Sequence, residues 1–280
     1  MKVYKAKSFG FCFGVKRALE IAKKTVVSKK AKVYIIGDIV HNEKVCKDIQ
    51  RQGIKKVKSI EEIPQNSYLI IKAHGVPKDV YEKARINKIK IVDATCPQVL
   101  EIHKIANNLI AKGYQIIIAG DKQHEETLGI LGNIKEGLVI ETPRDLKYLK
   151  NRLKKKVALV CQSTQDLKNV ANIVKGLVES EKELLFINTI CWETEKRQKE
   201  IKSLAKKCKS VLVVGSKKSA NSRRLYNIAK RLNKNTFFIQ DESQLSKKIK
   251  SFSSIALIGG ASTPPSSIEK ISEKLNRNLD

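Results

Sequence analysis

The sequence predicts an α/β protein made of three similar subdomains in a pseudo-threefold, trefoil-like arrangement. Short apolar runs typical of parallel strands alternate with helical stretches along the whole chain. The runs also recur with a long period, marked by Cys12, Cys96 and Cys191 at intervals of 84 and 95 residues. A chain of 280 residues buries enough surface to form its core without disulfides.

Each of these three cysteines ends a strand-like run and precedes a helix. The runs cover residues 3–12, 90–96 and 185–191. After each cysteine, apolar residues recur at the spacing that places them on one face of a helix. Every repeat is therefore expected to present a cysteine where a strand passes into a helix.

Three further runs complete each repeat. The second runs, at 33–38, 115–121 and 211–216, lead to His41, His124 and Ser219, which are 83 and 95 residues apart. The third runs are residues 57–60, 138–141 and 237–240, and the fourth are 68–71, 157–160 and 255–258. The fourth runs precede His74, Ser163–Thr164 and Ser262.

The repeats predict subdomains at residues 13–96, 97–191 and 192–280. The third repeat lacks a closing strand, and the N-terminal segment 1–12 is expected to supply it. Ligands of open α/β sheets bind beyond the carboxyl ends of the strands. We therefore expect the polar residues at these ends to meet in one cleft.

The chain is strongly basic, with 56 Lys+Arg against 28 Asp+Glu and a formal net charge of +28. The charge is spread along the chain as lysine, without an arginine-rich arm or an aromatic-interleaved RNA-binding motif, which favours a solvated surface over nucleic-acid binding. No apolar run reaches the roughly 20 residues that span a membrane, and the N-terminus has no signal-peptide pattern. We expect a cytoplasmic protein without a membrane or nucleic-acid partner.

Six cysteines in a cytoplasmic chain favour metal binding over disulfides. Three thiolates from three related units suit an iron–sulfur cluster at the centre of the trefoil, with one iron left open to substrate. The helix that follows each cysteine is expected to lower the pKa of its thiol. Zinc is the alternative metal. The remaining cysteines are interpreted as buried structural residues: Cys46, Cys161 and Cys208.

The polar residues that follow the strands are donors suited to a phosphate or diphosphate. They are His41, His74, His124, Ser219, Asn221 and Ser262, whereas His103 lies within a predicted helix and is interpreted as structural. Glu125 and Glu126 are both candidate proton donors, and the spacing does not choose between them. Thr164, with or without Ser163, either orients a carboxylate or substrate hydroxyl or caps the next helix.

Seven motifs resemble the 4-hydroxy-3-methylbut-2-enyl diphosphate reductase family, called IspH or LytB. They are residues 9–15, 37–42, 73–76, 93–97, 188–191, 215–222 and 260–262. They occur in family order and cover essentially the whole chain. The resemblance implies reductive removal of an allylic hydroxyl to give isopentenyl and dimethylallyl diphosphate, the last step of the non-mevalonate pathway.

The resemblance also assigns roles to the candidate residues. It implies that Cys12, Cys96 and Cys191 hold a 4Fe–4S cluster, that Glu126 delivers a proton and that Thr164 works beside it. The diphosphate pocket would comprise His41, His74, His124, Thr164, Ser219, Ala220, Asn221 and Ser262. An acidic ferredoxin or flavodoxin is the expected electron donor, attracted by the positive charge.

The chain departs from the family pattern near the expected site. Glu125 replaces the usual Pro, Ala220 a frequent Ser, and Lys218 a frequent Asn, while Trp192 follows Cys191 in place of a smaller residue and Ser163 stands where Thr is common. Two rival functions are a quinolinate-synthase-like dehydratase and a nucleic-acid-binding module with a zinc site. The Glu126–Thr164 pair and the histidine-rich pocket favour the reductase.

Overall fold

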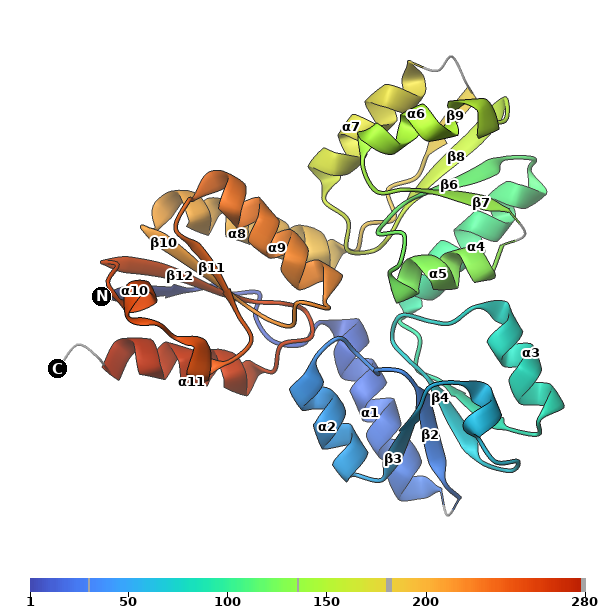
Figure 1. Ribbon diagram of the computed structural model, residues 1–280, viewed down its shortest axis with the longest axis horizontal. Helices are drawn as coiled ribbons and strands as arrows, with labels where there is room; N and C mark the ends of the chain where they lie inside the picture. Colours follow the sequence, from blue (N-terminus) through green and yellow to red (C-terminus); the bar gives the residue numbers. More distant parts are fainter. Residues whose placement is uncertain (30, 135, 180–182, 278–280) are drawn as a thin grey trace. The chain divides into compact units, whose positions relative to one another are not determined.

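The computed structural model describes residues 1–29, 31–134, 136–179 and 183–277 (Figure 1). The chain forms two compact units. The first comprises Met1–Lys16, Val40–Lys47 and Trp192–Asp280, and the second comprises Arg17–Ile39 and Asp48–Cys191. None of the helices in the described ranges is long and apolar enough to cross a membrane.

The first unit contains one parallel sheet with the strand order β1-β12-β10-β11. Its strands are β1 (Lys2–Lys5), β10 (Ser210–Val214), β11 (Thr236–Ile239) and β12 (Ser254–Gly259). Its helices are α8 (Trp192–Lys207), α9 (Ala220–Leu232), α10 (Lys247–Lys250) and α11 (Pro265–Asn276), with a 3₁₀ turn, η4, at Glu242–Gln244.

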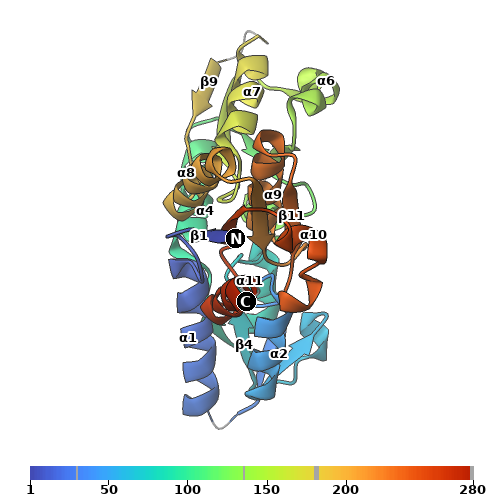
Figure 2. The same cartoon turned by 90° about the vertical axis from the view of Figure 1, so that its left-hand side faces the viewer.

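Alternation along its central strands gives this sheet two apolar faces. Val211 and Val213 of β10 pack with apolar residues of α8 and α9 on one face. Leu212 and Val214 pack with those of α10 and α11 on the other. Figures 1 and 2 show the helices on both sides of the sheet.

The second unit contains two parallel sheets, ordered β3-β2-β4-β5 and β7-β6-β8-β9. The first of these has β2 (Val33–Ile36), β3 (Ile54–Val57), β4 (Tyr68–Ile71) and β5 (Lys90–Asp93). The second has β6 (Gln115–Ala119), β7 (Gly137–Ile140), β8 (Lys156–Cys161) and β9 (Glu183–Phe186).

The helices of this region follow the strands in alternation. They are α3 (Lys78–Ile86), α4 (Pro97–Ala111), α5 (Glu125–Gly132), α6 (Leu146–Leu149) and α7 (Leu167–Val178), with 3₁₀ turns η1 (Ile60–Glu62), η2 (Pro143–Asp145) and η3 (Lys150–Arg152). Two more helices, α1 (Phe13–Ser28) and α2 (Glu43–Arg51), have residues in both units. Helices α4 and α5 pack on one face of the β6–β8 sheet, and α6 and α7 on the other.

All three sheets share one connectivity, and this confirms the expected α/β class with three similar four-stranded subdomains. In each sheet the strands from the second and fourth runs of the repeat are central, and the strand from the third run forms an edge. In the third sheet β1 pairs in parallel with β12, in the place that β5 and β9 take in the other two. The exact subdomain boundaries at 13–96, 97–191 and 192–280 stay a prediction.

One predicted strand is misplaced. The run at residues 57–60 lies at the end of β3, which covers Ile54–Val57, and Ile60 begins η1 instead. The turn packs Ile60 into the core below α3, which explains why an apolar residue stands here outside a strand. The amide of Ser59 donates to the Glu62 carboxylate, which ends the strand by capping the turn.

Candidate functional site

The start of α5 combines a helix cap with two acidic residues. His124 is the N-cap, and its Nδ1 accepts a hydrogen bond from the backbone N–H of Glu126 at 3.2 Å. Because Nδ1 is an acceptor here, the proton of the neutral imidazole resides on Nε2. His124 is thereby fixed as a neutral donor at the carboxyl edge of the β6–β8 sheet.

Glu126 is a buried carboxyl group, with 2% of its surface exposed. The backbone N–H of Ser163 donates to its Oε1 at 2.6 Å, and the Ser163 hydroxyl donates to its Oε2 at 2.9 Å. Burial raises the pKa of Glu126 to about 7, with a further rise from Asp121, and outweighs the Ser163 hydrogen bonds that lower it. A carboxyl group with this pKa both holds and releases a proton near neutral pH.

The hydroxyl that contacts Glu126 is that of Ser163, and the expected role of Thr164 beside Glu126 stays a prediction. Thr164 Oγ1 instead accepts from the Gln162 side-chain amide at 3.0 Å. The carbonyl of the same Gln162 side chain accepts from the backbone N–H of Asp121 at 2.9 Å. Consecutive residues after β8 point in different directions, and the sequence pattern alone does not reveal which hydroxyl faces α5.

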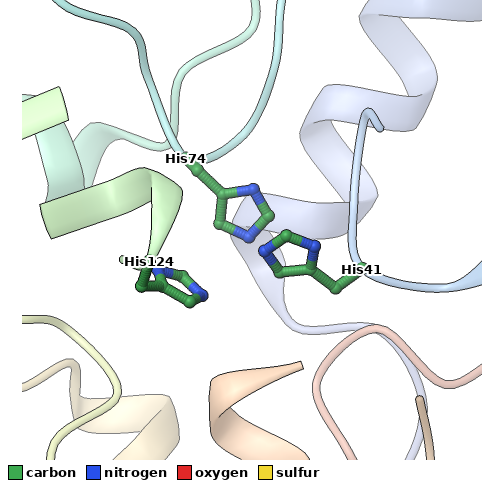
Figure 3. Close-up of side chains that lie close together, drawn as sticks. All are labelled: His41, His74 and His124. Atoms are coloured by element: carbon green, nitrogen blue, oxygen red, sulfur yellow. The ribbon is translucent and has the colours of Figure 1, made fainter. Parts of the chain in front are cut away.

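Glu125, the unusual residue at the start of α5, contacts two residues that follow β4. Its Oε1 lies 2.6 Å from Lys72 Nζ, and its Oε2 lies 3.5 Å from His74 Nδ1. Figure 3 shows the rings of His74 and His124 side by side, and their centroids are 5.5 Å apart in an edge-to-face arrangement. Sequence reasoning missed Lys72, for which the only signal was a basic residue two positions before His74.

The start of α9 is the counterpart of α5 in the first unit. Ser219 is its N-cap, and its hydroxyl accepts from the backbone N–H of Ser222 at 3.3 Å. Asn221 is only 4% exposed, and among the described residues neither polar atom of its amide has a hydrogen-bond partner. A buried amide in this condition favours a polar ligand that satisfies it. Ala220, also buried, offers only its backbone.

Ser262 and His41 lie together in the first unit. The Ser262 hydroxyl donates to the backbone carbonyl of His41 at 3.0 Å. This bond joins the loop after β12 to the segment that follows β2 in the chain. It fixes the backbone at His41, whose imidazole is labelled in Figure 3.

The three repeat cysteines are held by one recurring backbone contact. The backbone N–H groups of Cys12, Cys96 and Cys191 donate to the carbonyls of Ala261, Ala73 and Ser163 at 3.0, 3.0 and 2.9 Å. Each acceptor belongs to a loop that also holds a candidate ligand residue. The three cysteines form no disulfide and are partly exposed, whereas Cys46, Cys161 and Cys208 are buried, as expected for structural cysteines. His103 likewise lies buried within α4.

Burial raises the pKa of the Cys12 thiol overall, although the Val15 and Gly14 N–H groups at the start of α1 lower it as expected. The Val15 N–H lies 3.5 Å from Sγ, and the nearby Arg197 guanidinium also lowers this pKa. A metal centre supplies the positive charge that a buried thiolate needs. Partly exposed cysteines outside disulfides, placed at helix starts, are suitable soft ligands for iron–sulfur centres, so the donor set fits such a group.

Comparison with known proteins places this architecture in one family. The sequence matches the LytB protein family over residues 3–276. A Clostridioides difficile (strain 630) protein named 4-hydroxy-3-methylbut-2-enyl diphosphate reductase is 35% identical over 273 residues, which are 97% of this chain and 98% of that one.

Two solved structures extend the similarity to three dimensions. The 4-hydroxy-3-methylbut-2-enyl diphosphate reductase described as the terminal enzyme of the non-mevalonate pathway is 33% identical, with a TM-score of 0.71 over 99% of this chain and 100% of that one. The Plasmodium falciparum E-1-hydroxy-2-methyl-but-2-enyl-4-diphosphate reductase is 29% identical, with a TM-score of 0.92 over 98% of this chain and 87% of that one. Three parallel sheets of one connectivity, partly exposed cysteines where strands pass into helices and a match over nearly the full sequence lead to one conclusion: the chain belongs to the LytB family.

Proposed function

We propose that this protein reduces 4-hydroxy-3-methylbut-2-enyl diphosphate to isopentenyl and dimethylallyl diphosphate, the last step of the non-mevalonate pathway. The reaction breaks the allylic C–O bond with two electrons and two protons, of which one proton leaves in water and one enters the product. The observation that supports it most directly is the buried Glu126 carboxyl group, whose pKa is about 7, at the edge of a sheet beside two histidines. Family membership supports the substrate.

Cys12, Cys96 and Cys191 would hold a 4Fe–4S cluster. When bound, such a cluster supplies the electrons and a Lewis-acidic iron toward the substrate hydroxyl. The chain contributes three partly exposed cysteines outside disulfides, each fixed by its own backbone hydrogen bond. Their softness as ligands argues for an iron–sulfur centre over an oxygen-ligated metal ion.

The diphosphate would bind to the polar donors that follow the strands. The set comprises His41, His74, His124, Thr164, Ser219, Asn221 and Ser262, together with the backbone N–H of Ala220. The buried Asn221 amide and the neutral Nε2–H of His124 support this assignment. Binding the diphosphate end leaves the hydroxyl end of the substrate for Glu126.

Glu126 would deliver the proton that leaves in water. Ser163 holds both carboxyl oxygens, so the group keeps one orientation while it gains and loses the proton. We propose Ser163 as the hydroxyl that works with Glu126, and Thr164 as a residue that contacts the substrate. The buried surroundings limit the access of water to the carboxyl group.

An acidic ferredoxin or flavodoxin is the proposed electron donor, because a net charge of +28 attracts an acidic partner. Reduction rates that do not change with ionic strength would count against this proposal. We also propose a cytoplasmic location, supported by six cysteines that form no disulfide.

The function is tested with anaerobically purified protein. Iron and sulfide are measured for the wild type and for Cys12→Ser, Cys96→Ser and Cys191→Ser, with Cys46→Ser and Cys208→Ser as matched controls. We expect the first three to lose iron and dithionite-plus-viologen reductase activity, and the two controls to keep both. A zinc-loaded, colourless wild type, or the absence of both products, would overturn the proposal.

A further inference from the structure

We propose that Lys72 and Glu125 act as a positioning pair that holds His74 as a doubly protonated imidazolium facing the diphosphate. This inference rests on the proposed function and deepens it, because it assigns the charged donor of the pocket. Both members of the pair come from places where sequence reasoning expected no such role. Neither side chain needs to touch the substrate for this effect.

The geometry connects the loop after β4 to the first turn of α5. Lys72 follows β4 and is 8% exposed, and its Nζ lies 2.6 Å from Glu125 Oε1. The second oxygen of Glu125 lies 3.5 Å from His74 Nδ1. One carboxylate therefore bridges a buried ammonium group and one edge of the imidazole.

The backbone leaves space for this pair. Gly37, at the end of β2, has a φ of 76°, which favours glycine. A Cβ built at Gly37 would lie 3.3 Å from Lys72 Nζ and 3.4 Å from Glu125 Oε1. The glycine thus allows the ion pair to lie directly against the strand end.

The contacts of His74 and His124 favour different protonation states of the two imidazoles. His124 Nδ1 accepts a backbone N–H, so this imidazole is neutral and donates through Nε2 alone. His74 Nδ1 faces a carboxylate, which favours a proton on Nδ1. For His74 also to donate through Nε2 to a phosphate oxygen, its imidazole must be the cation.

The surrounding charges agree with this assignment. The Lys72–Glu125 pair is neutral as a unit, so a cationic His74 gives this edge of the pocket a positive charge for the diphosphate. His103 packs against Gly75, and burial lowers its pKa, so it stays neutral. Glu126, the next residue on α5, is directed to Ser163 and has a pKa of about 7.

The test uses the oxidised holoenzyme labelled with ¹⁵N-histidine, which contains only four histidines. In the wild type we expect His74 to keep its second proton to higher pH than His124. Glu125→Gln should move the His74 titration to lower pH and leave that of His124 unchanged. Lys72→Met removes a cation and leaves the Glu125 carboxylate uncompensated, so it should move the His74 titration to higher pH, and Lys72→Arg should restore the wild-type behaviour.

Affinity provides the second measurement. With inorganic diphosphate as the probe, Glu125→Gln should weaken binding about tenfold, the loss of one charge-assisted contact, and should raise KM more than it lowers kcat. Glu43→Gln is the matched control, because Glu43 is the exposed first residue of α2. An unchanged His74 titration, or an affinity for diphosphate equal to that of the control, would overturn the proposal that this pair holds His74 as a cation.

The outcomes for the pair and for the proposed function are distinct. If the wild type forms no isoprenoid product but Glu125→Gln still shifts His74 and weakens diphosphate binding, the reductase proposal fails and the pair stands. If the wild type forms both products and Glu125→Gln resembles the control in both measurements, the pair fails and the reductase stands.

Discussion

The starts of α5 and α9 have the same backbone arrangement. Each helix follows a strand that is directly succeeded by a glycine, Gly120 or Gly215. Each begins with a cap whose side chain accepts a helix N–H, from His124 Nδ1 in α5 and Ser219 Oγ in α9. Both starts therefore point backbone donors and a polar side chain beyond the sheet, as anion binding requires.

The residues at the two helix starts differ in whether their side chains ionise. The first turn of α5 contains ionisable Glu125 and Glu126, whereas that of α9 contains Ala220 and Asn221. The start of α5 holds a carboxyl group that is able to transfer a proton, whereas Ser219, Ala220 and Asn221 at the start of α9 are neutral. One backbone design thus presents an ionisable first turn in α5 and a neutral cap with a buried amide in α9.

The sharpest test of this contrast removes the acid of α5. Glu126→Gln should lower kcat by about 10²- to 10⁴-fold, the usual contribution of a general acid, and should leave iron content unchanged. Steady-state turnover with chemical reductant checks this. Turnover within about threefold of the wild type would remove Glu126 from the mechanism.

The variant Glu126→Gln should also change how the free energy of unfolding depends on pH. The Glu126 pKa is raised from 4.5 to about 7 in the folded protein, so the folded state binds this proton more tightly. The free energy of unfolding of the wild type should therefore fall as pH rises from about 4.5 to 7, and the neutral Gln escapes this loss. Denaturation at pH 8 should show a more stable variant, and denaturation at pH 4 an equal one.

On α9, Asn221→Ala should weaken diphosphate binding by about 10- to 100-fold, because the buried amide loses its contacts with a charged ligand. The apo stability should not fall, since among the described residues the amide has no hydrogen-bond partner. Calorimetry with inorganic diphosphate and thermal melts check the two effects. Asn227→Ala, on the exposed face of the same helix, is the control.

A smaller effect is expected from Ser163→Ala. The Ser163 hydroxyl donates to Glu126 Oε2 and lowers its pKa, so its removal should raise that pKa further. The alkaline limb of the pH–rate profile should then move to higher pH, with a few-fold change in the maximal rate. Thr164→Val should leave this limb in place, and a shift in that variant alone would return the role to Thr164.

The smallest effects are expected for two buried hydroxyl groups, one in α5 and one in α9. Thr127 Oγ1 and Ser222 Oγ are buried, and among the described residues neither has a hydrogen-bond partner. Thr127→Val and Ser222→Ala should each change the free energy of unfolding by about 1 kcal/mol or less, in the stabilising direction. Thermal melts measure this, and a loss of several degrees would show that these hydroxyls are satisfied.

Local pattern determined most of the fold and the positions of the candidate residues. Apolar runs predicted the strands because a strand segment covered on both faces must be apolar, as residues 116–119 of β6 and 157–161 of β8 are. The repeat at Cys12, Cys96 and Cys191 predicted one backbone environment for all three, and each makes the same type of hydrogen bond. Where a buried apolar residue belongs to a turn, as Ile60 does, the pattern wrongly placed it in a strand.

The sequence by itself determined the class of fold, the three-part repeat and the residue types at the strand ends, because these depend on hydrophobic period and spacing. Only the tertiary structure decided that Ser163 rather than Thr164 holds Glu126, and that Lys72 meets Glu125 across 53 residues. It also decided that burial raises the pKa of Cys12 although a helix follows it. These features depend on direction and distance through space, which turn geometry and desolvation set and no linear pattern encodes.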